Sequence, residues 1–402
     1  MSTAVRSYEF KIMTWWLKYR KTLLCLTIMI MTFAAIVWLG YEFWRLIFQI
    51  MPTGAIDLAQ RYREVHYWFA GKQVYGTLSS APYPPATYVI LWPILGWLDF
   101  TPVRWLWAAI AVAALIWLIR LLLKESCADM LLERVFISLI PLSMYATGAA
   151  IGNGQLIVLI LPILLAGLLL LLKGSGGWIN DLLASFLIIL SLVKPSIAVP
   201  FFWIVVIVPG RLRPALLVIF GYIGITIFAS LFQDFSLLLL LRSWIEAAIN
   251  NSSSATHSVS NLHSWMSFIG LERWITIPSL IILFVLGTWI FIYRHSDPWL
   301  LIGVTAFIAR IWTYHAWYDD MLIFLPMIAL FRIAKFNSAT NDDNLLAGVL
   351  LGTILIAMIA PGGLYLFPSP FNLIYVAFQV VIWFAVLTFL LYYTRRKNKK
   401  AR

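Results

Sequence analysis

The sequence predicts an all-α, polytopic membrane protein that forms a single transmembrane domain over residues 1–402. Of the 402 residues, 62% are hydrophobic and only 11% are charged, and the mean hydropathy is +0.90. A water-soluble domain has roughly a quarter of its residues charged. Apolar runs recur along the whole chain, and we expect about 10–12 membrane helices because a spanning helix needs about 20 residues.

The first apolar run, 22–45, carries no charge from Thr22 to Tyr41. It is too long for the core of a signal peptide and has no small-residue cleavage site, so we expect a retained membrane helix. Later apolar runs predict membrane helices at 103–123, 135–150, 155–172, 213–233, 274–293, 298–312, 319–335, 345–361 and 371–393.

Two shorter apolar units remain, 86–99 and the pair 181–193/195–209. The first is too short for a full crossing, and Lys194-Pro195 breaks the second, since proline disrupts helical geometry in itself and in the preceding residue. Helix ends at membrane depth are tolerated only where they line a protein cavity. Both units are therefore predicted to be re-entrant elements around a site.

The basic residues indicate which side of the membrane is cytoplasmic. Eleven of the 29 Lys and Arg residues lie in the N-terminal cluster and the tail 394–402, so both termini are expected in the cytoplasm. The net charge of +12 therefore indicates contact with membrane lipids and no nucleic-acid partner. On the opposite side we expect an external loop, 46–85, with an interfacial helix, and a second large external loop, 234–270.

Asp57 is the strongest candidate for a catalytic residue, because it opens the polar, aromatic stretch that follows the first membrane helix. A partly desolvated carboxylate at this position has a raised pKa and can act as a general base. The alternative is structural. Asp57 followed by Gln60 also fits a helix N-cap with a glutamine three residues on.

Several polar residues on the same side are candidates for substrate binding, each with a structural alternative. Arg63 and His66 could hold a phosphate or a sugar hydroxyl, or form the solvated face of a helix. Tyr83, before two prolines, could border the site or only mark a turn. Asn153 and Gln155, around Gly154, could bind a hydroxyl-rich ligand or form a plain helix–helix turn.

Lys194 is more specific, since a charge within an apolar pair is costly and indicates function, here with a lipid phosphate as its partner. The alternative is an interfacial lysine without a ligand. His315 and Asp319 could bind phosphate or sugar, or belong to an aromatic belt. Two cysteines and one His with an acidic pair are too few ligands to predict a metal, so we expect none, and no nucleotide-binding loop is present.

These motifs together resemble the GT-C glycosyltransferases, specifically glycosyltransferase family 87, typified by polyprenyl-phosphate-mannose-dependent alpha-1,2-mannosyltransferases. The resemblance rests on motifs that keep their order over roughly residues 50–320. The chain departs from the family pattern at Gly-Lys-Gln-Val-Tyr, where Asp-Pro is expected before the tyrosine, which puts the acceptor side in doubt. The similar pieces are Asp57, Gly71 to Tyr75 with Tyr83-Pro84-Pro85, Gly154-Gln155, Lys194-Pro195 and the turn around His315.

The resemblance implies a GT-C-like helical bundle with an outward-facing cavity, a polyprenyl-phosphate-linked sugar as donor and a glycolipid or glycan as acceptor. Transfer would be inverting and would need neither metal nor cofactor. Asp57 would deprotonate the acceptor hydroxyl, and Lys194 and His315 would hold the phosphate. Arg63, His66 and Gln155 would shape the sugar and acceptor pocket.

A transporter or flippase of a lipid-linked glycan is the rival interpretation. A flippase needs polar groups along its whole transmembrane path, whereas here they gather on one face of the membrane. The chain also shows no internal repeat, which many transporters carry. Both observations favour an enzyme in the cell membrane with its active site facing outside.

Overall fold

The computed structural model describes residues 3–50, 53–78, 81–174, 176–254, 260–335 and 341–401. Its regular elements are all helical, and the described residues contain no strand, only an isolated bridge between Met144 and Ile359. The all-α prediction is therefore confirmed. Three predicted segments lie partly outside the described residues: 51–52 and 79–80 of the first external loop, 255–259 of the second and Arg402 of the tail.

Five helices are long and apolar enough to cross a membrane, by length and composition, within the described part of the chain. Helices α6 (Tyr145–Asn153) and α7 (Ile157–Lys173) make a sixth span if the pair, bent by 115°, counts as one. The protein is thus a multi-pass membrane protein. The five candidate spans lie in α1 (Thr3–Phe48), α4 (Phe100–Glu125), α10 (Arg213–Ser230), α13 (Thr276–Tyr293) and α18 (Phe371–Ala401).

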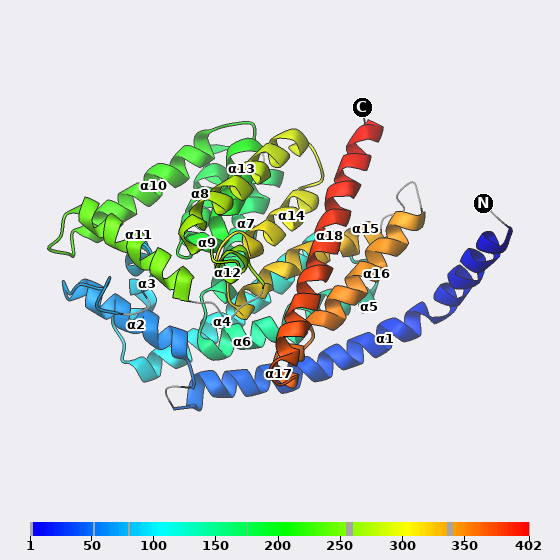
Figure 1. The fold of residues 1–402 in the computed structure, drawn as a ribbon, viewed down its shortest axis with the longest axis horizontal. Coiled ribbons are helices and arrows are strands. Elements are labelled where there is room, and N and C mark those ends of the chain that lie inside the picture. The colour runs from blue at the N-terminus through cyan, green and yellow to red at the C-terminus, as the bar shows by residue number, and fades with distance from the viewer. Residues whose placement is uncertain are drawn as a thin grey trace.

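The remaining helices pack around and between these spans (Figure 1). The predicted run 135–150 is two helices, because the chain takes an extended conformation at Met144. Helices α14 and α15 are largely buried and form part of the core. Further helices are α5 (Leu131–Ser143), α8 (Trp178–Ser191), α9 (Pro195–Ile207), α14 (Pro298–Ile311), α15 (Phe324–Lys335), α16 (Asn341–Met358), α17 (Gly363–Leu366) and the 3₁₀ helices η1 (Glu272–Trp274) and η2 (Trp317–Ile323).

Helix α3 (Pro85–Leu95) has both of its ends against α2 (Ile56–Phe69). At one end the guanidinium of Arg61 lies 4.2 Å from the ring centroid of Tyr83. At the other, the ring of His66 lies 3.1 Å from the carbonyl oxygen of Leu95. Both ends of this 11-residue helix therefore contact α2, which is the geometry that a re-entrant element would have. Helix α4 therefore starts on the same side as α2.

The segment 234–270, predicted as a loop, is largely helical. It contains α11 (Leu237–Ser254) and α12 (Leu262–Phe268). Apolar and polar residues alternate in α11 with the spacing of an amphipathic helix, and the indole of Trp244 donates a hydrogen bond to the carbonyl oxygen of Pro82 (3.0 Å). This contact places α11 beside α2 and α3, as Figure 1 shows.

Charged residues join the helix ends that lie far from α2. Glu125, at the end of α4, pairs with Lys173, at the end of α7. Arg396, near the end of α18, lies 3.0 Å from Asp343 of α16. The distal ends of α4, α7 and α18 thus carry ionic contacts at the end opposite the α2 side, and the chain ends marked in Figure 1 point away from α2, α3 and α11.

Candidate active site

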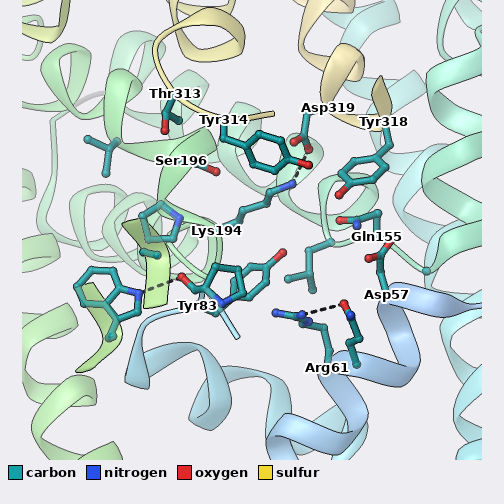
Figure 2. Close-up of a pocket in the computed structure, with 18 of the residues that line it drawn as sticks. Asp57, Arg61, Tyr83, Gln155, Lys194, Ser196, Thr313, Tyr314, Tyr318 and Asp319 are labelled. Atoms are coloured by element: carbon teal, nitrogen blue, oxygen red, sulfur yellow. Dashed lines mark hydrogen bonds and ion pairs between the residues drawn. The ribbon is translucent and has the colours of Figure 1, made fainter. Parts of the chain in front are cut away.

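A cavity of about 550 Å³ opens among α2, α9, α11, the α6–α7 turn and the segment 312–319 (Figure 2). Elements from both halves of the chain converge on it. Among its walls are five residues that the sequence analysis singled out: Asp57, Tyr83, Gln155, Lys194 and Asp319.

Asp57 is the second residue of α2, so the prediction that it caps this helix is wrong. The residue before the helix is Ala55, in the left-handed conformation (φ 52°, ψ 35°), with no side-chain cap. The tight backbone turn shifts the helix start by two residues and leaves the carboxyl group of Asp57 free to face the cavity. There it hydrogen-bonds the side chain of Gln155.

Gly154 explains how Gln155 comes so close to α2. Its φ of 72° ends α6 in the left-handed region, where glycine alone has no steric cost, and a Cβ atom there would collide with Leu58. The backbone amide of Ala55 also donates to the carbonyl oxygen of Gly152 (3.0 Å). These contacts seat the start of α2 directly on the α6–α7 turn.

Lys194 ends in a buried ion pair. It sits at the break between α8 and α9, and its Nζ lies 2.6 Å from Oδ1 of Asp319 and 5.0 Å from the ring centroid of Tyr318. The other carboxylate oxygen of Asp319 lies 2.9 Å from Nδ1 of His315. Asp319 therefore fixes the lysine at the cavity wall, as Figure 2 shows for Lys194 and Asp319, and His315 fixes Asp319.

Arg61 is a cavity residue that the sequence analysis missed. It lies one helical turn after Asp57, and this i, i+4 spacing on one helix face was the signal that could have found it. Its guanidinium stacks on Tyr83, and Nη2 lies 2.8 Å from Oε1 of the buried Glu64. Two cations, Arg61 and Lys194, thus face the cavity. Arg61 is paired with Glu64, and Lys194 is paired with Asp319.

Four predicted substrate-binding residues do not line this cavity. His315 is fully buried behind Asp319, Arg63 is exposed, and the ring of His66 contacts α3. The side-chain oxygen of Asn153 accepts a hydrogen bond from Arg45 of α1 (2.8 Å). For His315 and Asn153 the structure indicates positioning of Asp319 and of the α6–α7 turn, because neither reaches the cavity.

Burial shapes the ionisation of the two acids. It raises the pKa of Asp57, against the opposing effects of Gln155, Arg61 and Lys194. Burial alone would raise the pKa of Asp319 as well, but Lys194 and His315 hold it well below its usual range. The surroundings of Asp319 therefore favour its ionised form, whereas those of Asp57 favour the protonated form more than they do for an exposed carboxyl group.

In the described part of the chain, no three His, Cys, Asp or Glu side chains lie close enough together to hold a metal ion. The charged side chains that line the cavity are the carboxyl groups of Asp57 and Asp319 and the cations Arg61 and Lys194.

The fold and the site define a class: an all-α, multi-pass membrane protein with a polar cavity lined by the carboxyl group of Asp57 and the cations Arg61 and Lys194. Residues 82–331 match the model of glycosyltransferase family 87, and the chain belongs to this family. It is a membrane glycosyltransferase. The match contains Tyr83, Gln155, Lys194 and Asp319, whereas Asp57 lies upstream of it. Comparison with curated proteins and with solved structures gives no significant match.

Proposed function

We propose that the protein transfers a sugar, mannose or a related hexose, from a polyprenyl-phosphate donor to a lipid-linked or cell-envelope glycan, with Asp57 as the general base. The observation that carries the proposal is the placement of Asp57 in one cavity with Lys194 and Arg61. A base beside two cations suits a reaction in which a hydroxyl loses a proton while a phosphate leaves.

In the proposed reaction, Asp57 takes the proton of an acceptor hydroxyl, and the hydroxyl oxygen attacks the anomeric carbon of the donor sugar. The new glycosidic C–O bond forms as the bond between that carbon and the phosphate oxygen breaks. Polyprenyl phosphate leaves with the electron pair, so the anomeric configuration inverts. The reaction needs no metal or cofactor, because the side chains supply both the base and the countercharge.

Lys194 and Arg61 are the proposed ligands of the leaving phosphate. Both are buried, at 9% and 5% exposure, so a charge-assisted contact there is little screened by water. Tyr83 lies between them, with its ring on Arg61. Gln155, which already bonds Asp57, is placed to hold a sugar or acceptor hydroxyl next to the base.

The cavity is proposed to face the outside of the cell membrane, with both termini in the cytoplasm. This orientation is supported by the positive-inside rule, applied to the basic tail. The tail end of α18 lies with the ionic contacts of α4 and α7, away from the α2 side.

A transporter of a lipid-linked glycan is the second candidate, and the packing of α7 disfavours it. This helix leads from the cavity toward Lys173, and its buried residues, from Ile157 to Leu171, are all apolar or glycine. A polar headgroup would find no hydrogen-bonding partner along this helix.

The test uses purified protein in nanodiscs, a set of donors with mannose, glucose or galactose on polyprenyl phosphate, and membrane glycolipid extract as acceptor. We expect one donor to release polyprenyl phosphate and to label a glycolipid. Asp57→Asn should abolish both signals, whereas the matched control Asp99→Asn, an exposed carboxylate before α4, should keep them. Normal transfer by Asp57→Asn would remove Asp57 as the base, and no consumption of any donor by the wild-type protein would refute the donor class.

A further inference from the structure

A second cavity, of about 380 Å³, lies between α1 and the 361–366 segment that holds α17. Its walls carry three aromatic rings, those of Trp38, Tyr41 and Tyr365, and the ion pair of Glu42 and Arg45. It does not share a lining residue with the cavity around Asp57.

The α6–α7 turn separates the two cavities. On one side of the turn, Asn153 accepts a hydrogen bond from Arg45, and a side chain at Gly152 would collide with Glu42. On the other side, Gln155 lines the cavity around Asp57. The second cavity therefore lies at the same end of the helical bundle as the proposed active site. The turn residues that border the two cavities, Asn153 and Gln155, are two positions apart in the sequence.

Glu42 is the residue that demands an explanation. It is 2% exposed and belongs to a segment, Lys21–Phe48, that can span the membrane, where a carboxylate is costly. Oε2 accepts a hydrogen bond from Nε of Arg45 (2.6 Å). Among the described residues no hydrogen bond to Oε1 is formed, so one oxygen of a buried carboxylate is left for a donor that enters the cavity.

Two of the aromatic rings that line this cavity, those of Tyr41 and Tyr365, also reach the protein surface. The ring of Trp38 meets Tyr365 edge to face, with centroids 5.2 Å apart, and lies 6.1 Å from the ring of Tyr41. Tyr41 and Tyr365 are 49% and 43% exposed. A ligand could thus enter from the membrane surface and lie against rings while it reaches Glu42.

We propose that this second cavity binds the sugar headgroup of a membrane glycolipid. A sugar ring presents C–H groups, which pack on aromatic faces, and hydroxyl groups, which can donate to the free oxygen of Glu42. An alkyl chain or a lipid phosphodiester would leave that oxygen unpaired, because neither has a hydrogen to donate to it. Of these membrane components, the sugar headgroup can both pack on the aromatic rings and donate a hydrogen bond to Glu42.

The test is site-mapped photolabelling in phosphatidylcholine nanodiscs, which avoids sugar-based detergents. The probes are dodecyl glycosides of mannose, glucose and galactose with a diazirine on the sugar, and the labelled residues are identified by mass spectrometry. We expect label within 38–45 and 361–366 from at least one probe, competed by its methyl glycoside and not by dodecanol. Equal competition by dodecanol would show an alkyl-chain site, and absence of label from both segments would show that no sugar binds; either result overturns the proposal.

Two variants test the walls of the cavity. Glu42→Gln should weaken labelling about tenfold to a hundredfold, because a charged hydrogen bond to a ligand is lost. Tyr41→Ala should also weaken it, whereas the matched control Tyr392→Ala, a similarly exposed tyrosine of α18, should not. If both variants fold normally, unchanged labelling in Glu42→Gln and Tyr41→Ala would refute the site.

The result is separable from the proposed function, because labelling of this cavity needs no turnover. Labelling without donor consumption would refute the transfer reaction and keep the second site. Donor consumption without labelling would do the reverse.

Discussion

Lys194 and Asp319, 125 residues apart in the sequence, form a buried ion pair whose Nζ–Oδ1 distance is 2.6 Å. The pair closes the cavity wall between the break after α8 and the 3₁₀ helix η2. Because Asp319 is also bonded to His315, the lysine is held in one position before any ligand arrives. A preorganised cation of this kind costs no rearrangement when a phosphate leaves.

Replacement of Lys194 should therefore affect both folding and binding. Lys194→Met leaves the Asp319 charge buried without its cation, and we expect a loss of about 3–5 kcal/mol in the free energy of unfolding. Donor affinity should fall about tenfold to a hundredfold, since a charge-assisted contact is worth about 1.5–3 kcal/mol. Thermal melts and donor-binding titrations measure the two effects.

A double variant separates these effects. Lys194→Met with Asp319→Asn removes the unpaired charge, so stability should recover while donor affinity stays low. Arg242→Met is the control, because the Arg242–Glu246 pair is exposed and should contribute less than about 1 kcal/mol. Donor affinity equal to that of the wild-type protein in the double variant would exclude Lys194 as a phosphate ligand.

The pH dependence of transfer should report Asp57. Burial raises the pKa of this carboxyl group above the ordinary aspartate value of 3.8, so the acid limb of kcat/KM should lie above that value. Lys194 opposes the shift, and Lys194→Met should therefore move the limb further up. Initial rates at subsaturating donor, measured from pH 3 to 8, give kcat/KM and both positions. A limb in the wild-type protein at or below pH 3.8 would contradict the assignment of Asp57 as base.

Glu64 should make the stability of the protein depend on pH. Burial raises its pKa from 4.5 to about 7, although Arg61 opposes the shift. The stabilising contribution of the protonated form is complete below pH 4.5 and is lost as the pH rises through 7. At about 1.4 kcal/mol per pH unit, the loss is on the order of 3 kcal/mol. Melts should show this decline in the wild-type protein and a smaller one in Glu64→Gln; equal slopes would contradict it.

Gly154→Ala should destabilise the protein by more than about 1 kcal/mol, because alanine is strained at φ 72° and its methyl group would collide with Leu58. The displaced α2 should also lower transfer, since it carries Asp57. Gly348→Ala is the matched control: this glycine is helical with open space around it, so alanine should be neutral or stabilising. Melts and transfer rates test both variants, and similar behaviour of the two would refute the role given to Gly154.

The topology prediction can be tested in intact cells with an impermeant thiol reagent, in a background with Cys25 and Cys127 replaced by serine. A cysteine at Gln73, on the loop after α2, should react. Cysteines at Lys124, in the last turn of α4, and at Lys397, in the tail, should react only once the membrane is opened; all three positions are exposed. Labelling of Lys124 together with Gln73 would place both ends of α4 on one side and exclude the proposed arrangement.

Much of the site could be predicted from the sequence because charge is rare in this chain. Lys194 interrupts an apolar pair, and Asp57 opens a polar stretch, so each stands out against its surroundings. Gly154 marked the turn that carries Gln155. The start of α2 could not be read in the same way, since the left-handed turn at Ala55 depends on its contact with Gly152, a residue far away in the sequence.

Other features depend on tertiary contacts that no local pattern encodes. His315 and Asp319 are close in sequence, but the turn before η2 buries the histidine and leaves only the carboxylate at the cavity. The sequence predicts a loop over 234–270, whereas Trp244 of α11 donates a hydrogen bond to the carbonyl oxygen of Pro82 and closes one wall of the cavity. Amphipathic spacing in that segment was the signal that went unused.

The length of α7 has a consequence for where substrates meet. Its 17 residues extend about 26 Å, slightly less than the ~30 Å thickness of a bilayer's hydrocarbon layer. In the proposed orientation Lys173 lies at one membrane surface, and Gln155 would then lie just beneath the headgroups of the opposite leaflet. The proposed prenyl-linked donor would reach the cavity by lateral diffusion, with its tail still dissolved in lipid, while a hydrophilic acceptor would descend only a few ångströms from water. The reaction would take place at the boundary between lipid and water. The donor would be supplied by diffusion within the bilayer, and the acceptor by diffusion from the aqueous phase.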